Sequence, residues 1–158
     1  MIKQGTLPIY AGLIWMLLFA AMSFYWAAGG RVGVKSVGGE ISHKVLNGEQ
    51  DIIAIVWLTG FGKLGGAIIL LLMLKKWRHV KINKILSSLT IVAGVFMLLY
   101  GLVNFITISL AGLHVLEFDL SPFALKWRLI FWEPFWMAGG VLYLMAGINV
   151  RQIKLKRD

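Results

Sequence analysis

The sequence predicts an all-α membrane protein with four transmembrane helices arranged as two hairpins. Hydrophobic residues make up 59% of the 158, whereas about 45–50% is usual in a soluble domain. The mean hydropathy is +0.80. Four stretches are each long enough to cross a hydrocarbon core of about 30 Å, which needs roughly 20 apolar helical residues. They are, approximately, residues 7–28, 52–74, 85–111 and 122–148.

The first stretch is expected to be a retained helix and not a cleaved signal peptide. Lys3 precedes its apolar run, as in a signal peptide. However, the run exceeds the usual core of about 7–15 residues and ends in the bulky Phe24-Tyr25-Trp26. Because no low-complexity tract or linker divides the chain, residues 1–158 are expected to form a single four-helix transmembrane domain.

The residues that most often hold metals are absent or scattered. The chain has no cysteine, which excludes disulfides, thiolate metal sites and cysteine nucleophiles. The three histidines, His43, His79 and His114, lie in three different connecting segments without the spacing of metal ligands. We therefore expect neither a metal site nor a bound cofactor.

The charged residues are distributed unequally between the two ends of the four helices. At the end that holds both termini, ten basic residues accompany one acidic residue, whereas the opposite end is neutral. Lys63 and Glu133 lie within the spans and cancel, so the net charge of +9 belongs to one end. By the positive-inside rule, this end and both termini are cytoplasmic. The basic residues there are Lys3, Lys75, Lys76, Arg78, Lys81, Lys84, Arg151, Lys154, Lys156 and Arg157, with Asp158; the opposite end has Arg31, Lys35, Lys44, Lys126 and Arg128 with Glu40, Glu49, Asp51, Glu117 and Asp119.

These basic residues suit a membrane surface better than a nucleic acid. Near an anionic bilayer, each contributes about 1 kcal/mol of attraction. Nucleic-acid binding is not expected, because the aromatic residues belong to the spans and form no exposed stacking platform. The expected partners are the lipid bilayer and its anionic headgroups at the cytoplasmic face.

The connection after the first helix, residues 29–51, is the longest. Within it, residues 40–47 predict a short surface helix, with Glu40 and Lys44 paired at i,i+4 and Gly48 as its C-terminal stop. An ordinary glycine-rich connection and a lid over a substrate site are both open for this segment. The apolar side chains of the short helix, expected to face lipid, are Ile41 and Val45.

Two spans carry small residues at spacings that allow close helix packing in lipid. Gly62 and Gly66 lie four residues apart in the second span, and Gly94, Gly101 and Asn104 lie on roughly one face of the third. The Asn104 amide could also form a hydrogen bond across helices. These faces would suit a homodimer as readily as internal packing, and assembly into a larger membrane complex is also left open.

The fourth span has a defined start and an interruption. Ser121 predicts an N-cap and Pro122 the first helical residue, as Asp51 predicts a cap for the second span. Pro134 falls about a dozen residues further on. It is expected to kink the helix and to free the carbonyl group of Ile130.

Lys63 and Glu133 are the two charged residues that the apolar parts of the spans contain. A lysine at mid-bilayer costs from about 2.5 to over 10 kcal/mol, so it needs a partner or a wet cavity. If the Gly-Gly pairs 65–66 and 139–140 lie level, the axial offset between the two charges is about 6 Å, within reach of a lysine side chain. We therefore predict a Lys63–Glu133 ion pair between adjacent second and fourth spans.

Three functions are compatible with such a pair. As a structural lock, it would fix the helix register of an accessory membrane component, which is the function that the sequence favours over an enzyme. In a small transporter, Glu133 would be the exchangeable acid of an aromatic cavity that could hold a cationic substrate. In a membrane enzyme acting on a lipid-like substrate, Glu133 would be the general acid or base. No catalytic residue is assigned; the candidate binding residues are Lys63, Glu133, Trp132, Trp136, Trp57, Asn104, Tyr25 and Trp26.

A fourth interpretation assigns these residues no site. The tryptophans would form the aromatic belt at the outer interface, and Glu133 would reach the headgroups. This interpretation requires the fourth helix to begin only at Pro134.

Several motifs resemble those of a known family. The most specific is Trp132-Glu133-Pro134-Phe135-Trp136, and the others are Tyr25 to Gly30, Trp57 through Gly60 to Lys63-Leu64-Gly65-Gly66, Tyr100-Gly101 and Gly139-Gly140. In these motifs, which cover nearly the whole chain, the sequence resembles a family of small bacterial four-helix membrane proteins known only as a domain of unknown function. The resemblance implies a bacterial membrane location and four helices, and it implies no activity.

Overall fold

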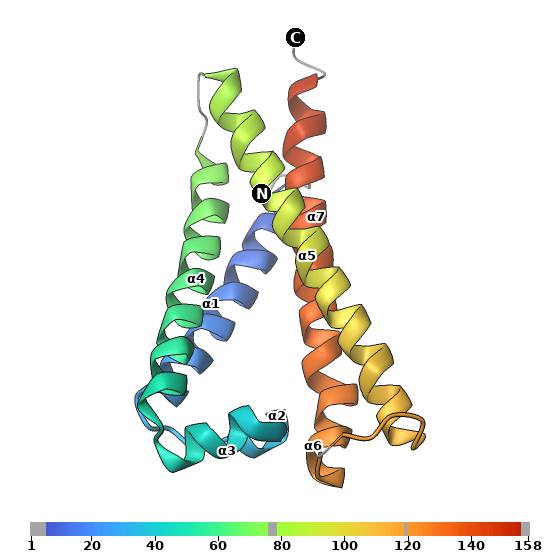
Figure 1. Cartoon of the computed structure of the whole chain (residues 1–158). Helices are drawn as coiled ribbons and strands as arrows, with labels where there is room; N and C mark the ends of the chain where they lie inside the picture. Colours follow the sequence, from blue (N-terminus) through green and yellow to red (C-terminus); the bar gives the residue numbers. More distant parts are fainter. Residues whose placement is uncertain (1–5, 76–78, 119, 156–158) are drawn as a thin grey trace.

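The computed structural model describes residues 6–75, 79–118 and 120–155, and most of these residues are helical (Figure 1). Four helical stretches are long and apolar enough to cross a membrane, which confirms the predicted fold class. Three of them are α1 (Leu7–Ala27), α4 (Gln50–Leu74) and α5 (Val80–Gly112). The fourth joins α6 (Pro122–Trp127), the π-helical segment η1 (Arg128–Trp132) and α7 (Glu133–Leu155); two short helices, α2 (Val34–Val37) and α3 (Gly39–Asn47), lie between α1 and α4.

The helix ends agree with the predicted caps at one span and differ at another. The Ser121 side chain accepts a hydrogen bond of 3.2 Å from the backbone N–H of Ala124, so the predicted N-cap of the fourth span is confirmed. The predicted cap of the second span at Asp51 is wrong. Asp51 lies inside the first turn of α4, because the extended residue that precedes the helix is Glu49. There the carboxylate can still interact favourably with the positive end of the helix dipole.

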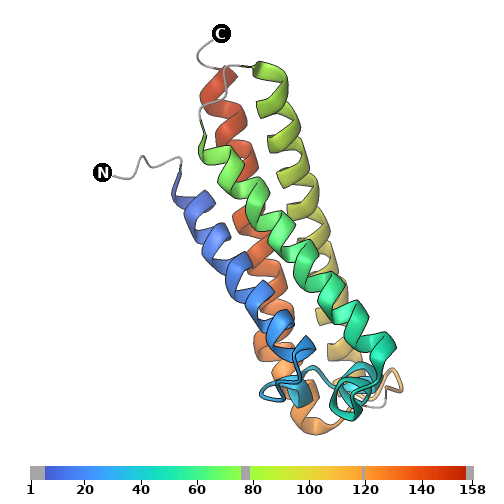
Figure 2. The ribbon, with the colours of Figure 1, turned by 90° about the vertical axis from the view of Figure 1, so that its left-hand side faces the viewer.

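The four spans pack as two hairpins. α4 lies along α1, and α5 lies along α7, while the main contact between the hairpins joins α1 to α7 (Figures 1 and 2). This agrees with the predicted hairpins but contradicts the predicted adjacency of the second and fourth spans, since α4 and α7 are not principal neighbours.

Glycines allow the backbones of α5 and α7 to approach closely. A Cβ atom on Gly140 would lie 2.6 Å from the backbone nitrogen of Leu98, and one on Gly94 would lie 2.9 Å from the carbonyl oxygen of Gly140. The predicted packing face of the third span is therefore correct. The predicted face of the second span is only half correct, because Gly66 packs against Met16 whereas Gly62 faces open space.

Aromatic rings fill the contact between the hairpins. Trp15 of α1 stacks on Phe135 of α7 with ring centroids 4.8 Å apart, and Phe19 meets Trp136 edge-on at 4.8 Å. Such pairs contribute about 0.5–1.5 kcal/mol each beyond the area they bury. This cluster fixes α1 against the part of α7 that follows the π-helical segment.

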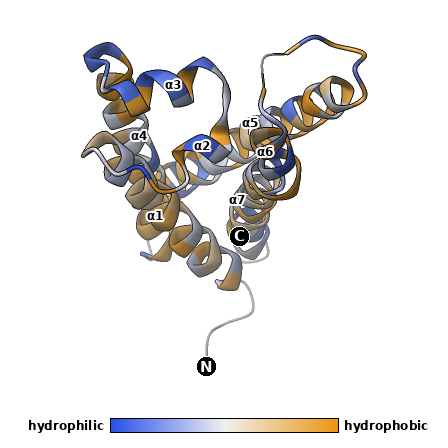
Figure 3. Ribbon diagram, turned by 90° about the horizontal axis from the view of Figure 1, so that it is seen from below, coloured by the Kyte–Doolittle hydropathy of each residue, from blue (hydrophilic) through white to orange (hydrophobic). Residues whose placement is uncertain are grey.

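The short helices α2 and α3 lie across one end of the bundle, between the ends of the two hairpins (Figures 1 and 3). The prediction for α3 is confirmed, because Glu40 and Lys44 form an ion pair of 2.8 Å and the helix stops at Gly48. Gly48 has a φ angle of +74°, which favours glycine. The hydrogen bond from Lys44 holds the pKa of Glu40 below its usual value and raises the pKa of Lys44.

The described basic residues of the predicted cytoplasmic end do share one end of the bundle. Lys75, Lys81 and Lys84 flank the connection between α4 and α5, and Arg151 lies in the last turns of α7, which ends at the same end of the bundle (Figure 1). The other residues used in the charge argument at this end, including Lys3, Lys76 and Arg78, lie outside the described residues or side chains. The opposite end carries α2 and α3.

Candidate functional site

A cavity of about 490 Å³ lies between the two hairpins, next to α2 and α3. Every span contributes to its wall, and α2 and α3 contribute from the end of the bundle. Most of the lining side chains are apolar, but three carry formal charges within the spans: Lys63 on α4, Arg128 in η1 and Glu133 at the start of α7. The cavity is therefore where the charged side chains of two described spans meet.

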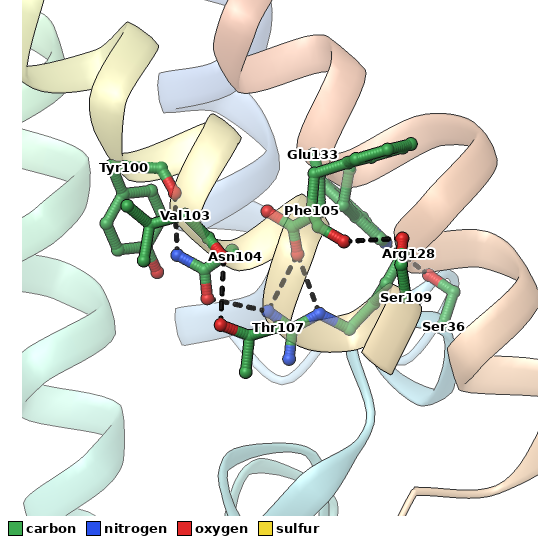
Figure 4. A network of polar contacts seen from close by, with 10 residues as sticks. Ser36, Tyr100, Val103, Asn104, Phe105, Thr107, Ser109, Arg128 and Glu133 are labelled. Carbon is green, nitrogen blue, oxygen red and sulfur yellow. Dashed lines mark hydrogen bonds and ion pairs between the residues drawn. The ribbon is translucent and has the colours of Figure 1, made fainter. Parts of the chain in front are cut away.

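The π-helical segment brings Arg128 and Glu133 together. In a regular α-helix, residues turn by about 100° each, so two residues five apart point about 140° away from each other. In η1 the backbone N–H of Glu133 donates to the carbonyl group of Arg128, five residues earlier, and this wider turn places such residues on nearly one face. The Arg128 guanidinium reaches Glu133 Oε1 with Nη2 at 2.7 Å and Nε at 2.8 Å (Figure 4).

Pro134 gives a physical reason for this turn. Proline has no N–H and cannot donate to the residue four positions earlier, Ile130. The expected interruption of the fourth span is therefore present, but it takes the form of a π-helical turn directly before the proline. π-Helical turns occur frequently at functional sites.

Asn104 of α5 completes this polar network. Its Oδ1 atom accepts a hydrogen bond of 3.2 Å from Arg128 Nη2, and its amide nitrogen donates to the Tyr100 carbonyl group at 2.8 Å (Figure 4). The predicted ability of Asn104 to bond across helices is thus confirmed. Glu133 is buried, with a side-chain exposure of 2%, whereas Arg128 retains 20%. The network ties the two helices of the second hairpin together.

Lys63 lies on the opposite wall of the cavity with a different set of partners. Its ammonium group donates a hydrogen bond of 2.6 Å to Ser23 Oγ of α1. It also lies 3.9 Å from the ring centroid of Phe19, where the face of the ring attracts a cation. Both partners are uncharged. No carboxylate of the described residues forms an ion pair with Lys63.

The predicted Lys63–Glu133 ion pair is therefore wrong. The axial estimate assumed that the second and fourth spans are neighbours, but α4 packs on α1, which turns Lys63 toward Ser23. Glu133 is paired within its own helix by Arg128. The two predicted residues nevertheless line the same cavity. The interpretation in which Glu133 reaches the headgroups is also wrong, because the helix begins at Pro122 and Glu133 is buried.

The cavity brings together most of the predicted binding residues. Trp132, Trp136 and Trp26 line it with Lys63, Glu133 and Asn104. Two others lie elsewhere. Trp57 packs against Phe24 and Phe61 on the surface of the first hairpin, and Tyr25 is 43% exposed with its hydroxyl group near the backbone of Val32.

Sequence reasoning missed two polar residues of the site. The charge count groups Arg128 with the residues of the outer end and assigns it no partner within the span. Arg128 lies five residues before Glu133, whereas side chains that meet on an α-helix are three or four residues apart. The two side chains can meet only because of the π-helical turn. Ser23 is the only hydroxyl-bearing serine or threonine within α1, and this could have marked it as a partner for a buried charge.

The formal charges of the lining side chains, Lys63 and Arg128 against Glu40 and Glu133, sum to zero, but Glu40 has its own partner outside the lining. Arg128 neutralises Glu133, which leaves the charge of Lys63 in excess. Glu40, at the edge of the cavity next to α3, is paired with Lys44. Among the described residues, no group of three or more histidines and carboxylates is placed to hold a metal ion. The site is thus a largely apolar cavity with one cation that lacks an anionic partner in the described chain.

These features define a helical membrane protein with four candidate spans and a cavity between two hairpins. A family model described as "Protein of unknown function (DUF3995)" matches residues 16–143, and the chain belongs to this family. The matched region includes every described polar residue of the cavity. No curated protein and no solved structure matches the chain.

Proposed function

We propose that this protein binds a small oxyanion, a carboxylate or phosphate group, in the cavity between its hairpins, with Lys63 as the counter-ion. The observation that carries the proposal is the environment of Lys63. An ammonium group within a membrane requires a partner or a wet cavity, and a serine hydroxyl with one ring face uses only part of its capacity for three donated hydrogen bonds. An anion in the cavity would accept the remaining hydrogen bonds of the Lys63 ammonium group.

The Arg128–Glu133 pair serves a different purpose in this proposal. It takes over the structural role that the sequence suggested for a Lys63–Glu133 pair, because it ties η1 and α7 to Asn104 of α5. With Glu133 neutralised in this way, a cationic substrate would meet the excess positive charge of Lys63. The cavity therefore favours an anion over the cation expected for a transporter that uses Glu133 as its exchangeable acid.

We also propose the location of the protein. The basic end of the bundle faces the cytoplasm by the positive-inside rule. The resemblance implies a bacterial membrane, and we assign the protein to the inner membrane. In this orientation α2 and α3 lie at the outer surface, and the cavity belongs to the outer half of the bilayer.

Thermal unfolding of the purified protein in a non-ionic detergent tests the proposal. Butyrate and inorganic phosphate would be compared with butyltrimethylammonium at matched ionic strength. A ligand at about 100 times its Kd stabilises a protein by about 2.7 kcal/mol, which raises the Tm by about 5 °C or more. We expect a saturable increase of this kind with an anion and none with the cation.

Two variants make the test specific for the site. Lys63→Met should abolish the stabilisation by the anion, and Lys126→Met, which removes an exposed lysine outside the cavity, should retain it. Equal stabilisation of the Lys63→Met variant would show that the anion binds elsewhere and would refute the proposal. Stabilisation by the cation alone would favour the transporter with Glu133 as its exchangeable acid.

A further inference from the structure

The α4 wall of the cavity changes from apolar to charged along its length. Ile52, Ile55 and Val56 line the part next to α3, followed by Thr59 and then Lys63. At a rise of 1.5 Å per residue, Ile52 and Lys63 lie about 16 Å apart along the helix. A ligand with a medium-length hydrocarbon chain would extend over this distance, whereas a free inorganic or short organic anion would not. The wall is therefore complementary to a molecule with an anionic group at one end and an apolar chain at the other.

The apolar wall continues onto α3. Ile41 and Val45, which were expected to face lipid, line the cavity. With Val34 and Val37 of α2, they give this end of the cavity a largely apolar roof, which also includes Glu40 and Ser42 of α3. The roof is attached to the second hairpin, because Trp132 Nε1 donates a hydrogen bond of 2.9 Å to Ser36 Oγ.

The cavity reaches the lipid-facing surface between α4 and α5. These helices meet near their connected ends, where Thr90 Oγ1 lies 3.0 Å from Met73 Sδ, and diverge toward α3 (Figure 1). Ile55 of α4 and Tyr100 of α5 line the cavity, yet they are 53% and 42% exposed. Because both residues lie in membrane spans, this opening faces the hydrocarbon of the bilayer.

From this arrangement we infer that the ligand is an anionic amphiphile with a single apolar chain, which enters from the bilayer between α4 and α5. The inference rests on the proposed oxyanion site. The anionic group binds Lys63, and the chain lies along Ile52, Ile55 and Val56 with its end toward the opening. An amphiphile dissolved in the bilayer already lies beside the opening, and its chain would cover the apolar wall of Ile52, Ile55 and Val56 that a free anion leaves uncovered.

Photo-cross-linking in nanodiscs tests this inference. The probe is a medium-chain fatty acid with a diazirine near its methyl end, and the control probe is the neutral fatty alcohol with the same diazirine. Adducts are located by mass spectrometry of peptides. We expect the acid to label the α4 residues 52–56 at least tenfold more than the alcohol does, and we expect excess butyrate to remove this labelling by occupying Lys63.

Three variants test separately how labelling depends on access along α4 and on the charge of Lys63. Thr59→Trp places a large ring on the cavity side of α4 and should reduce labelling by the acid at least fivefold. Leu58→Trp, which adds the same ring at a neighbouring position that is 71% exposed and outside the cavity lining, should leave it unchanged. Lys63→Met should bring the labelling by the acid down to that by the alcohol.

The outcomes distinguish this inference from the proposed function. If butyrate stabilises the protein through Lys63 but the acid and the alcohol label residues 52–56 equally, the oxyanion site stands and the amphiphile is refuted. If neither stabilisation nor acid-specific labelling depends on Lys63, both proposals fail. If Leu58→Trp reduces labelling as much as Thr59→Trp does, the opening between α4 and α5 is not the route.

Discussion

Arg128 and Glu133 lie five residues apart in one helical span, yet their side chains form an ion pair of 2.7 Å. A regular α-helix would direct them away from each other, so the pair depends on the π-helical turn between them. The same turn precedes Pro134 and positions Trp132 and Glu133 on the cavity. One local departure from α-helical geometry therefore builds a whole wall of the candidate site.

Loss of one member of this pair should destabilise the protein. Glu133→Gln or Arg128→Met is expected to lower the free energy of unfolding by on the order of 1–3 kcal/mol, less than the 3–5 kcal/mol of a fully buried pair because Arg128 is partly exposed. The double variant should recover part of the loss, with a coupling energy of about 1 kcal/mol or more. Reversible unfolding in detergent measures all three values.

The combination of Lys63→Met with Glu133→Gln provides the matched control for this cycle. Since the two residues do not contact each other, their effects should add to within about 0.5 kcal/mol. A coupling as large as that between Arg128 and Glu133 would contradict the observed pairing and restore the ion pair expected from the sequence.

Glycines of the two hairpins should differ sharply in their tolerance of alanine. Gly140→Ala would place a Cβ atom 2.6 Å from the backbone nitrogen of Leu98, which cannot move aside without separating α5 from α7. We expect a loss of roughly 1–3 kcal/mol, as in other overpacked contacts. Gly62→Ala has open space around it and should be neutral or stabilising by up to about 1 kcal/mol through helix propensity. The Tm values of the two variants give the comparison; equal losses would contradict the assigned packing faces.

The attachment of α2 to the second hairpin should depend on Ser36. Ser36→Ala removes the acceptor of the 2.9 Å hydrogen bond from Trp132 Nε1 and leaves a buried donor without its partner. Hydrogen exchange of the backbone amides in α2 and α3 should become several-fold faster, while exchange in α5 stays the same. Ser88→Ala, at an exposed serine of α5, is the control and should change neither region. Unchanged exchange in the Ser36→Ala variant would show that this bond does not hold the roof.

The Glu40–Lys44 pair should make α3 sensitive to acid. The pKa of Glu40 is lowered in the folded protein, so the pair stabilises α3 above the ordinary glutamate pKa of about 4.3 and loses this effect as the pH falls through the lowered value. Carbon NMR of the Glu40 carboxyl group should report a midpoint below about 4.3 in the wild type. In Lys44→Met that midpoint should rise toward the ordinary value. No difference between the two proteins would contradict the pairing.

The sequence was sufficient to predict the parts of the fold that depend on local patterns. Hydrophobic length located the four spans, and Ser121, Gly48 and the Glu40–Lys44 spacing predicted a helix start, a helix stop and a surface pair. These features depend on neighbouring residues in the chain, so one sequence contains the necessary information.

The errors came from assumptions about neighbours in space. The predicted ion pair assumes that the second and fourth spans are neighbours with their Gly-Gly pairs level. Instead, Gly140 packs on α5, Gly66 lies between Met16 of α1 and the Tyr143 hydroxyl group of α7, and α4 and α7 belong to different hairpins. Arg128 lies near the end of the bundle that carries α2 and α3, as its charge group predicts, but its pairing with Glu133 requires the π-helical turn. The π-helical turn brings Arg128 onto Glu133, and the packing of α4 on α1 turns Lys63 toward Ser23.

The central claim is that Lys63 is an anion-binding group in a membrane cavity, and NMR of the lysine side chains tests it most directly. Lysines carrying ¹³C at Cε would be observed in detergent, with the Lys63 signal identified by its absence from Lys63→Arg. We predict that butyrate shifts the Lys63 signal in a saturable manner and leaves that of Lys126 in place. A Lys63 signal that stays fixed at saturating butyrate, or that shifts only together with the exposed lysines, would contradict the account.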